Sequence, residues 1–375
     1  MRKCVKNNIK IISYYNYTMK LLKPFLLCIP LFFPVTCEGF IMPILQQTKT
    51  IINPLHLLEP NRANTPEHYE SQSQQLPMQK NIKNKIGQIM NLIRAHHIAP
   101  TLFLCISGGW LMNPSIFYLL HSVTFVVFTI NIILIMSASM AINDLYDIEM
   151  DRINSPQRPL VTGAITKKEA IFTIFLLLGA SEYLSLKFLP SYLQTIMHLA
   201  IIYINIYTPI LKKILVLKNI SCAALVSLSV FLSALATTNK PIILHKNFDL
   251  LLIACNLIFT GSWANEILLD IRDYEGDNQQ GLATLPTTLG KQSSWTIALL
   301  ILYIGMAINS MTMAHLFNLK ISSLFLLLTT PQLYYFFNII KNDYSHKSIE
   351  TYMKHSNKTL VAILLFIQNI HFIHF

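Results

Sequence analysis

The stretch NDLYDIEMD (Asn143–Asp151) closes one apolar run, and DIRDYEGD (Asp270–Asp277) closes another farther along the chain. In each stretch three aspartates stand at relative positions 0, 3 and 7. At about 3.6 residues per turn these positions share one face of a helix, so each stretch is predicted to aim three carboxylates in one direction. Like charges at this spacing repel one another, so a cation is expected to offset them.

Magnesium is the cation that these acids predict. Mg²⁺ takes about six oxygen ligands and commonly links one or two carboxylates to substrate phosphates. Two facing clusters would therefore hold Mg²⁺ ions with a diphosphate between them. The alternative is that the acids only cap two helix ends, and the identical spacing at two places argues against it. The predicted metal ligands are Asp144, Asp147, Asp151, Asp270, Asp273 and Asp277.

The composition predicts a multi-pass membrane protein. Of the 375 residues, 53% are hydrophobic and only 13% are charged, and the mean hydropathy is +0.46. A soluble domain carries about 25% charged residues, so soluble, disordered and fibrous proteins are excluded. The Lys and Arg residues behind the net charge of +11 are scattered, which predicts no nucleic-acid partner. The six cysteines show no CxxC and no zinc spacing.

Nine apolar blocks approach the roughly 20 residues that a membrane-spanning helix needs. They predict an all-α bundle with spans at 92–111, 116–141, 168–187, 192–209, 219–237, 249–268, 294–314, 321–340 and 358–374. Thirteen Lys and Arg residues fall in or beside the loops after the even-numbered spans, against four on the other side. This bias places the even-numbered loops, and both acid clusters with them, on the cytosolic or stromal side.

The first 85 residues are predicted to be a targeting leader, and residues 86–375 the membrane-spanning domain. From Met19 to about residue 39 a basic start, a short apolar stretch and small residues have the layout of a signal peptide, with Met1 or Met19 as the start. A polar stretch without hydrophobic period follows, and we expect it to be disordered. Together they resemble the bipartite leader of proteins sent to plastids of algae with complex plastids, and Phe40 suits the first cleavage point. The alternatives are a plain signal peptide or a membrane anchor of another endomembrane.

Around the acid clusters the chain resembles the UbiA superfamily of intramembrane prenyltransferases. The resemblance rests on NDLYDIEMDRINSPQRPLVTG (Asn143–Gly163), DIRDYEGDNQQGLATLPTTLG (Asp270–Gly290) and the YTPILKK turn (Tyr207–Lys213), and it covers about residues 85–375. It implies nine helices around a central cavity, with both aspartate motifs over the cavity mouth. It also implies Mg²⁺-dependent transfer of a prenyl chain from a polyprenyl diphosphate, through an allylic carbocation, to an acceptor.

The resemblance assigns roles to individual residues. Asp144, Asp147, Asp270 and Asp273 are the expected catalytic residues. The expected diphosphate ligands are Asn143, Arg94, Arg158 and Lys212. Arg158 and Lys212 also stand out without the resemblance, because each follows a proline-containing turn near a helix end, where Arg and Lys can bind phosphate oxygens.

The motifs do not select one acceptor. The compact second motif resembles both homogentisate prenyltransferases and the enzymes that make archaeal ether-lipid precursors, whereas chlorophyll synthases space its acids more widely. Because the leader favours a plastid, we expect an aromatic quinone or tocopherol precursor such as homogentisate. The alternatives are a glycerol-phosphate ether lipid, chlorophyllide, a terpene cyclase of the same fold, and a divalent-cation transporter. The sequence does not fix the oligomeric state.

Overall fold

The computed structural model describes residues 82–238 and 241–370, and these ranges contain helices and turns but no strand. The predicted signal peptide and the polar stretch after it lie outside them. The helices are α3 (Ile82–Leu92), η2 (Ala95–His97), α4 (Ile98–Met112), α5 (Ile116–His121), α6 (Val123–Tyr146), α7 (Ile148–Asn154), α8 (Lys167–Phe188), α9 (Ser191–Tyr207), η3 (Leu211–Lys213), α10 (Leu217–Leu235), η4 (Ile242–Leu244), α11 (Phe248–Arg272), α12 (Tyr274–Gln279), α13 (Leu285–Leu289), α14 (Lys291–Leu316), α15 (Leu319–Lys341) and α16 (His346–Asn369).

Polar residues cap several of the long apolar helices. The Ser122 hydroxyl accepts a hydrogen bond from the backbone N–H of Phe125 at the start of α6, at 3.4 Å. Thr166 and Glu169 form a reciprocal capping box at the start of α8, and Asn318 begins α15. Each cap satisfies backbone N–H groups that the first helical turn leaves without a partner. The helices can then remain apolar along their length.

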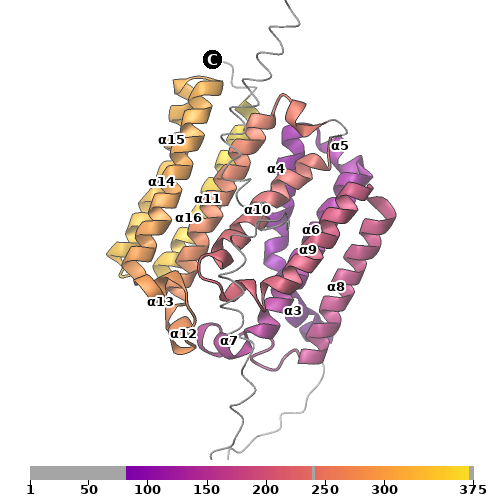
Figure 1. The fold of residues 1–375 in the computed structure, drawn as a ribbon, viewed down its shortest axis with the longest axis vertical. Helices are drawn as coiled ribbons and strands as arrows, with labels where there is room; N and C mark the ends of the chain where they lie inside the picture. The colour runs from indigo at the N-terminus through magenta and orange to yellow at the C-terminus, as the bar shows by residue number, and fades with distance from the viewer. Residues whose placement is uncertain (1–81, 239–240, 371–375) are drawn as a thin grey trace, which may run out of the picture. The chain divides into compact units, whose positions relative to one another are not determined.

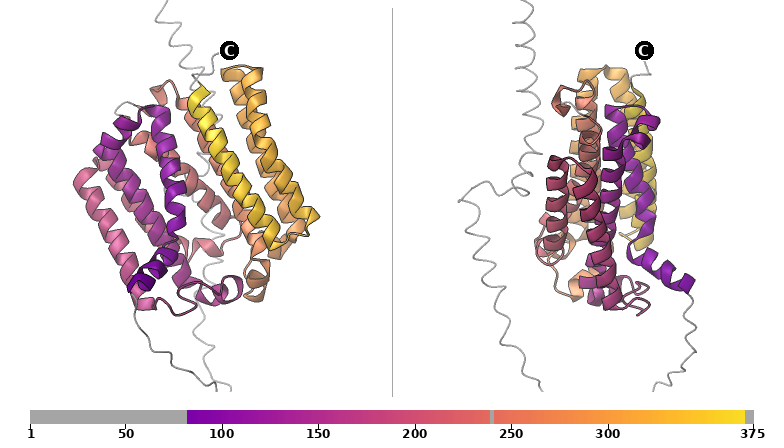
Figure 2. Two further views of the ribbon diagram at one scale, coloured as in Figure 1. Left: turned by 180° about the vertical axis from the view of Figure 1, so that it is seen from behind. Right: turned by 90° about the vertical axis from the view of Figure 1, so that its right-hand side faces the viewer.

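The helices form two groups, each with its own hydrophobic cluster. The first cluster lies among α6, α8 and α9 and includes Phe128 and Met197. The second lies among α11 and α14 to α16 and includes Trp295, Phe336 and Tyr352. The two groups are drawn at opposite sides of Figure 1, and Figure 2 shows α16 beside α4, which it contacts.

Helices α4 and α10 join the two groups. They pack against each other; α4 also contacts α6, and α10 contacts α11. Their approach is so close that a Cβ on Gly108 would collide with the backbone carbonyl of Val230, so a glycine is required there. As a result α6 and α11, which carry the two acid motifs, end at the same end of the bundle. The short helices α7 and α12 contact each other there (Figure 1).

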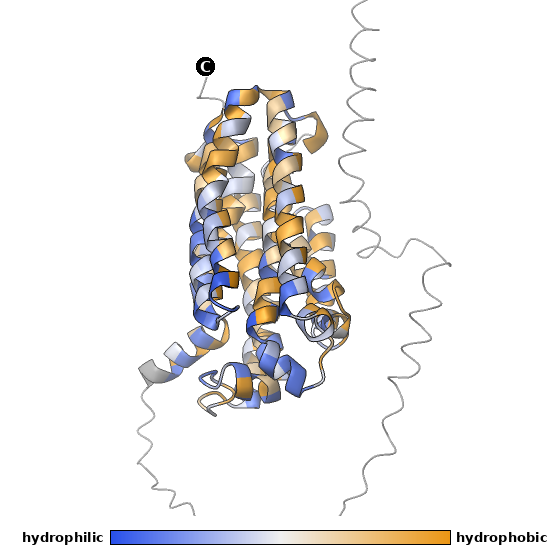
Figure 3. Ribbon diagram, turned by 90° about the vertical axis from the view of Figure 1, so that its left-hand side faces the viewer, coloured by the Kyte–Doolittle hydropathy of each residue, from blue (hydrophilic) through white to orange (hydrophobic). Residues whose placement is uncertain are grey.

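Membrane crossing is supported for most, but not all, of the nine predicted spans. Helices α6, α8, α10, α11, α14 and α15 are long and apolar enough to cross a membrane, and the bent pair α3 and α4 would make a seventh. Helix α9 has 17 residues, and α16 has a polar first half. Among the described residues the count of nine membrane spans is therefore not confirmed, although a helix lies at each predicted place. Figure 3 shows hydrophobic residues dominating the long helices and hydrophilic ones gathered near the lower end.

Three predicted spans differ more from the structure than the others, whose ends shift by only a few residues. The first, 92–111, contains a bend of 56° around Arg94, and its long helix begins only at Ile98. The second, 116–141, is divided at Ser122 into α5 and α6, because Ser122 ends one helix and caps the next. The last, 358–374, begins much earlier, at His346, because the polar residues before 358 are also helical.

Candidate functional site

The two acid motifs form backbone corners of nearly the same geometry. Helix α6 ends at Tyr146, and Asp147 (φ −96°, ψ 12°) begins α7. Helix α11 ends at Arg272, and Asp273 (φ −90°, ψ 9°) begins α12. The prediction that each motif continues one helix is therefore wrong: the middle aspartate is a corner, and the third lies on a separate short helix. Aspartate favours such helix boundaries because its side chain competes with helical hydrogen bonding.

Hydrogen bonding runs through both corners, so the aspartates of each motif stay in consecutive turns. The Asp147 N–H donates to the Asn143 carbonyl at 3.0 Å, and the Asp151 N–H donates to the Asp147 carbonyl at 2.7 Å. The equivalent bonds of Asp273 and Asp277 measure 2.9 and 3.1 Å. Each corner thus keeps one aspartate at the end of a long helix and turns the next two over that end.

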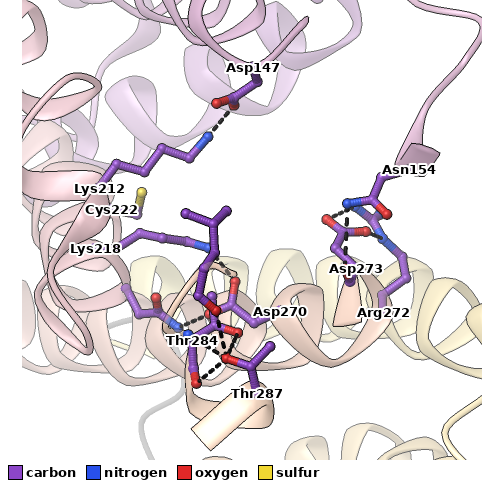
Figure 4. A network of polar contacts seen from close by, with 12 residues as sticks. Asp147, Asn154, Lys212, Lys218, Cys222, Asp270, Arg272, Asp273, Thr284 and Thr287 are labelled. Atoms are coloured by element: carbon purple, nitrogen blue, oxygen red, sulfur yellow. Dashed lines mark hydrogen bonds and ion pairs between the residues drawn. The ribbon is translucent and has the colours of Figure 1, made fainter. Parts of the chain in front are cut away.

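Contacts between α7 and α12 hold the corners together. The Asn154 side chain donates to the backbone carbonyl of Asp273 at 3.4 Å (Figure 4). A Cβ on Gly276 would collide with the Asn154 side chain. The glycine of the second motif therefore allows an approach that another residue would obstruct, and the approach joins the two motifs.

Three cations from separate segments meet the first motif. Arg94 Nη2 donates to Asp144 Oδ1 at 2.8 Å, from a residue in the left-handed region (φ 49°) at the bend between α3 and α4. Arg158 Nη1 donates to the same oxygen, and its Nε lies 3.5 Å from Asp151 Oδ1. Lys212 Nζ donates to Asn143 Oδ1 at 2.9 Å and to Asp147 (Figure 4). The structure thus brings Arg94, Arg158 and Lys212 to the first motif, which itself contains Asn143.

The second motif has cationic partners that the sequence analysis did not single out. Lys218 pairs with Asp270, and Asn219 Nδ2 donates to the other Asp270 oxygen at 2.9 Å. Arg272 contacts both oxygens of Asp273 at 2.7 and 2.9 Å. Lys218 and Arg272 were counted only as part of the charge bias between the two membrane sides. The signal that could have identified Lys218 is its place at the start of an apolar helix, close behind Lys212.

The donor set suits a divalent cation. Asp144, Asp151, Asp270 and Asp277 are buried, and the Oδ2 atoms of Asp144 and Asp151 have no hydrogen-bond partner. Buried carboxylate oxygens without a partner are costly, and a hard cation is a ligand that would satisfy them. In the described part of the chain, no three acidic, His or Cys side chains already converge as a metal centre. In this structure, basic side chains lie at the carboxylate oxygens that a metal ion would contact.

Burial raises the pKa of the third aspartate of each motif. It raises the pKa of Asp151 to about 6; Arg158 opposes this shift, whereas Asp144 and Asp147 add to it. Burial likewise raises the pKa of Asp277 to about 6, against the opposing charge of Lys218. Both groups therefore exchange protons near neutral pH, where a bound cation would favour their charged forms.

The opposite end of the bundle carries a groove that these motifs do not line. Its volume is about 700 Å³, and Thr124, Lys187, Leu189 and Tyr192 are among its lining residues. Those residues lie at the start of α6 and around the junction of α8 and α9, far along the helices from Asp144. The central cavity implied by the resemblance stays a prediction.

The family match places the chain in a class, the multi-pass membrane prenyltransferases. The sequence profile of the UbiA prenyltransferase family matches residues 101–358, and the chain belongs to that family. The relatives that it matches include the digeranylgeranylglyceryl phosphate synthase of Saccharolobus solfataricus, 28% identical over 244 residues, which are 64% of this chain and 83% of that protein. The synthase of the same name from Sulfolobus acidocaldarius is 33% identical over 220 residues, 57% of this chain and 73% of that protein.

Solved structures share the fold. A UbiA homologue from Archaeoglobus fulgidus bound to DMAPP and Mg²⁺ matches with a TM-score of 0.53 at 21% sequence identity, covering 76% of this chain and 99% of that one. A structure of a digeranylgeranylglyceryl phosphate synthase matches equally well, at 23% identity over 76% of this chain and 97% of that one. The family membership confirms the resemblance to the UbiA superfamily that the motifs indicate.

Proposed function

We propose that this protein transfers a prenyl chain from a polyprenyl diphosphate to the hydroxyl group of a glycerol-phosphate ether lipid, with Mg²⁺ as cofactor. The observation that carries the donor half is the pair of matched corners, which present six aspartates and five cationic partners at one end of the bundle. Carboxylates suit the metal ions and cations suit the phosphates, and a diphosphate with Mg²⁺ offers both.

The acceptor half rests on the relatives. The chain covers most of the length of two archaeal enzymes named digeranylgeranylglyceryl phosphate synthase, one of them 33% identical in sequence. This favours the ether-lipid alternative over the aromatic acceptor expected from the leader. The plastid location rests on the leader alone, which lies outside the described residues. The bilayer itself would supply both the donor and a lipid acceptor.

The proposed chemistry needs no nucleophilic side chain. Bound Mg²⁺ would neutralise the leaving diphosphate, so that the allylic C–O bond breaks and leaves a resonance-stabilised carbocation. Asp144, Asp147, Asp270 and Asp273 would hold the metal ions, with Asp151 and Asp277 completing the ligand set. Arg94, Arg158 and Lys212 would turn from the carboxylates to the phosphate oxygens, and Asn143 would orient Lys212. The acceptor oxygen would then bond to the carbocation and lose its proton to the departed diphosphate, while apolar helices exclude water.

A transfer assay with purified protein tests the proposal. The full chain in detergent is given labelled geranylgeranyl diphosphate, Mg²⁺ and, separately, geranylgeranylglyceryl phosphate, homogentisate or chlorophyllide. Of these three acceptors, we expect only geranylgeranylglyceryl phosphate to give labelled product. Product with homogentisate instead would restore the aromatic reading, and a cyclised product without any acceptor would make the protein a terpene cyclase. Absence of prenyl transfer together with Mg²⁺ flux into liposomes would overturn the transferase reading.

A further inference from the structure

The segment between α9 and α10 sends one lysine to each acid motif. Lys212, in η3, contacts Asn143 and Asp147 of the first motif. Lys218, in the first turn of α10, contacts Asp270 of the second motif. Figure 4 shows the two side chains extending from the same side toward Asp147 and Asp270. A short segment therefore links both corners through two cations.

Both the burial of Lys218 and its contact with Asp270 indicate that it belongs to the site. Its side chain is 18% exposed, slightly less than that of Lys212 at 19%, and Asp270 is nearly fully buried. A lysine that serves only the charge bias between membrane sides would keep its ammonium in water. Asn219 occupies the second Asp270 oxygen, so Lys218 and Asn219 together orient this carboxylate from the first turn of α10.

The backbone before α10 is strained in a way that places these two residues. Val216 adopts φ 68° and ψ −39°, a positive φ that is unfavourable for a β-branched residue. Such strain is often stored at functional sites, where the surrounding structure enforces it. Here it turns the chain sharply, so that α10 begins at Leu217 and its first turn faces Asp270.

We infer that Lys218 is a further diphosphate ligand, which binds the leaving group from the side of the second motif as Lys212 does from the first. The inference rests on the proposed function. With Mg²⁺ and the prenyl diphosphate bound, Asp270 would serve as a metal ligand and the Lys218 ammonium would pair with a phosphate oxygen. Asn219 is a positioning residue that keeps Asp270 oriented during this exchange. The diphosphate is thus held across the gap between the two corners.

The phosphate of a glycerol-phosphate acceptor is the other ligand of the same chemistry. The placement favours the diphosphate, because Lys218 lies on a metal-binding carboxylate just as Lys212 does, and the metal ions must contact the leaving group. An acceptor phosphate has no reason to lie between the metal ligands of both motifs. The two possibilities predict different effects of replacing Lys218: a diphosphate ligand changes the pyrophosphate Kd and the KM for the donor, and an acceptor ligand changes the KM for the acceptor.

Calorimetric titration of inorganic pyrophosphate with Mg²⁺ tests the inference without turnover. Lys218→Gln keeps a hydrogen-bond donor for Asp270 but removes the charge, and we expect its pyrophosphate Kd to rise about 10-fold or more. Lys218→Arg should remain within about 3-fold of wild type, since the charge persists. Lys347→Gln, which changes an exposed lysine in the first turn of α16, is the matched control and should leave the Kd unchanged. In turnover, Lys218→Gln should raise the KM for the prenyl diphosphate and not that for the acceptor.

Specific results would overturn the inference. A wild-type Kd in Lys218→Gln, alongside lost binding in Lys212→Gln, would leave Lys218 as an ion pair that only stabilises the fold. A raised acceptor KM with unchanged pyrophosphate binding would assign Lys218 to the acceptor instead. Wild-type protein that binds no pyrophosphate with Mg²⁺ would overturn the proposed function and this inference together.

Amine modification of the wild-type protein keeps the test independent of variant folding. Pyrophosphate with Mg²⁺ should slow the modification of Lys218 and Lys212 and leave that of Lys347 unchanged, as followed by mass spectrometry of peptides. Faster modification of Lys218 on ligand binding would mean that the ligand releases it from Asp270 into solvent, which contradicts its role as a diphosphate ligand.

Discussion

The two acid motifs have the same backbone and different electrostatic surroundings. Asp147 and Asp273 turn the chain with nearly equal dihedral angles, and α7 and α12 follow them. The first motif receives cations from two distant segments, through Arg94 and Lys212, and from Arg158 in the turn just after α7. The second is served by Lys218 and by Arg272, its own chain neighbour. The spacing of aspartates thus specifies the corner, whereas the tertiary fold specifies which cations reach it.

The difference suggests a division of labour between the corners. Arg158 joins two carboxylates of the first motif, so that corner is crosslinked by its cations. In the second motif each of Asp270 and Asp273 has its own cation, and Asn219 adds a hydrogen bond. The first corner would therefore depend more strongly on a single arginine than the second does.

The largest expected effect tests what the corners share. Asp147→Ala and Asp273→Ala should each reduce prenyl transfer by about 1000-fold or more, because each removes a metal ligand from a site that stabilises developing charge. Labelled-product assays measure the loss, and gel filtration with helical circular dichroism checks the fold. Glu149→Gln is the control, since Glu149 is exposed and pairs with Arg152, which is itself exposed. Near-wild-type turnover in either alanine variant would mean that the corners cap helices and bind no metal.

The next prediction tests where the corners differ. Arg158→Met should lower affinity for Mg²⁺ with pyrophosphate by about 30-fold, because it leaves two buried carboxylates without their shared partner and removes a phosphate ligand. Arg272→Met should have a smaller effect, since Arg272 serves one partly exposed aspartate. Titration calorimetry of both variants, with the exposed Arg152→Met as control, gives the ranking. Equal losses at the two arginines would contradict the division of labour.

The sequence predicts those features of the two motifs that depend on local pattern, and it misses those that depend on tertiary packing. The aspartate spacing and the apolar blocks predicted both motifs, their shared membrane side and the helical fold, because these depend on local pattern. The breaks at Asp147 and Asp273 were missed, since a face calculated for a continuous helix ignores the preference of aspartate for helix boundaries. Lys218 and Arg272 were missed because the charge bias explained them already. Only the packing of α10 on α11 brings Lys218 to Asp270.

A third prediction uses the electrostatic feature that the corners share. Asp151 and Asp277 both have pKa values raised to about 6 by burial. Protons should therefore compete with Mg²⁺ below pH 6, so the Mg²⁺ concentration for half-maximal activity should rise, by at most about tenfold per pH unit for each proton displaced. The stability of the metal-free protein should instead increase as the pH falls. A raised pKa means that the folded state binds more protons than the unfolded state between about pH 4 and 6, so its stability rises as the pH falls.

Two measurements check these pH dependences of the Mg²⁺ requirement and of the stability. Activity at varied Mg²⁺ between pH 7 and 5 gives the first, and thermal unfolding of the metal-free protein over the same range gives the second. Asp151→Asn and Asp277→Asn should each make the Mg²⁺ requirement less dependent on pH. A Mg²⁺ requirement that does not change from pH 7 to 5 would show that neither carboxylate binds metal in its charged form.

The smallest expected effect concerns the contact that joins the corners. Gly276→Ala adds a Cβ that collides with the end of the Asn154 side chain, and that side chain can swing away at the cost of its hydrogen bond to the Asp273 carbonyl. We expect a loss of about 1 kcal/mol in stability and a few-fold loss in turnover. Gly261→Ala is the matched control within α11, because its Cβ would meet no atom within 4 Å, and alanine favours a helix over glycine.

A double-mutant cycle decides whether that contact is the reason for the glycine. Asn154→Ala removes both the colliding side chain and the hydrogen bond, so Gly276→Ala added to it should cause little further loss of stability or turnover. The two effects are then strongly non-additive, as expected of residues in direct contact. If instead the losses add, Gly276 serves the α12 backbone alone, and the two corners are held together by contacts other than Asn154.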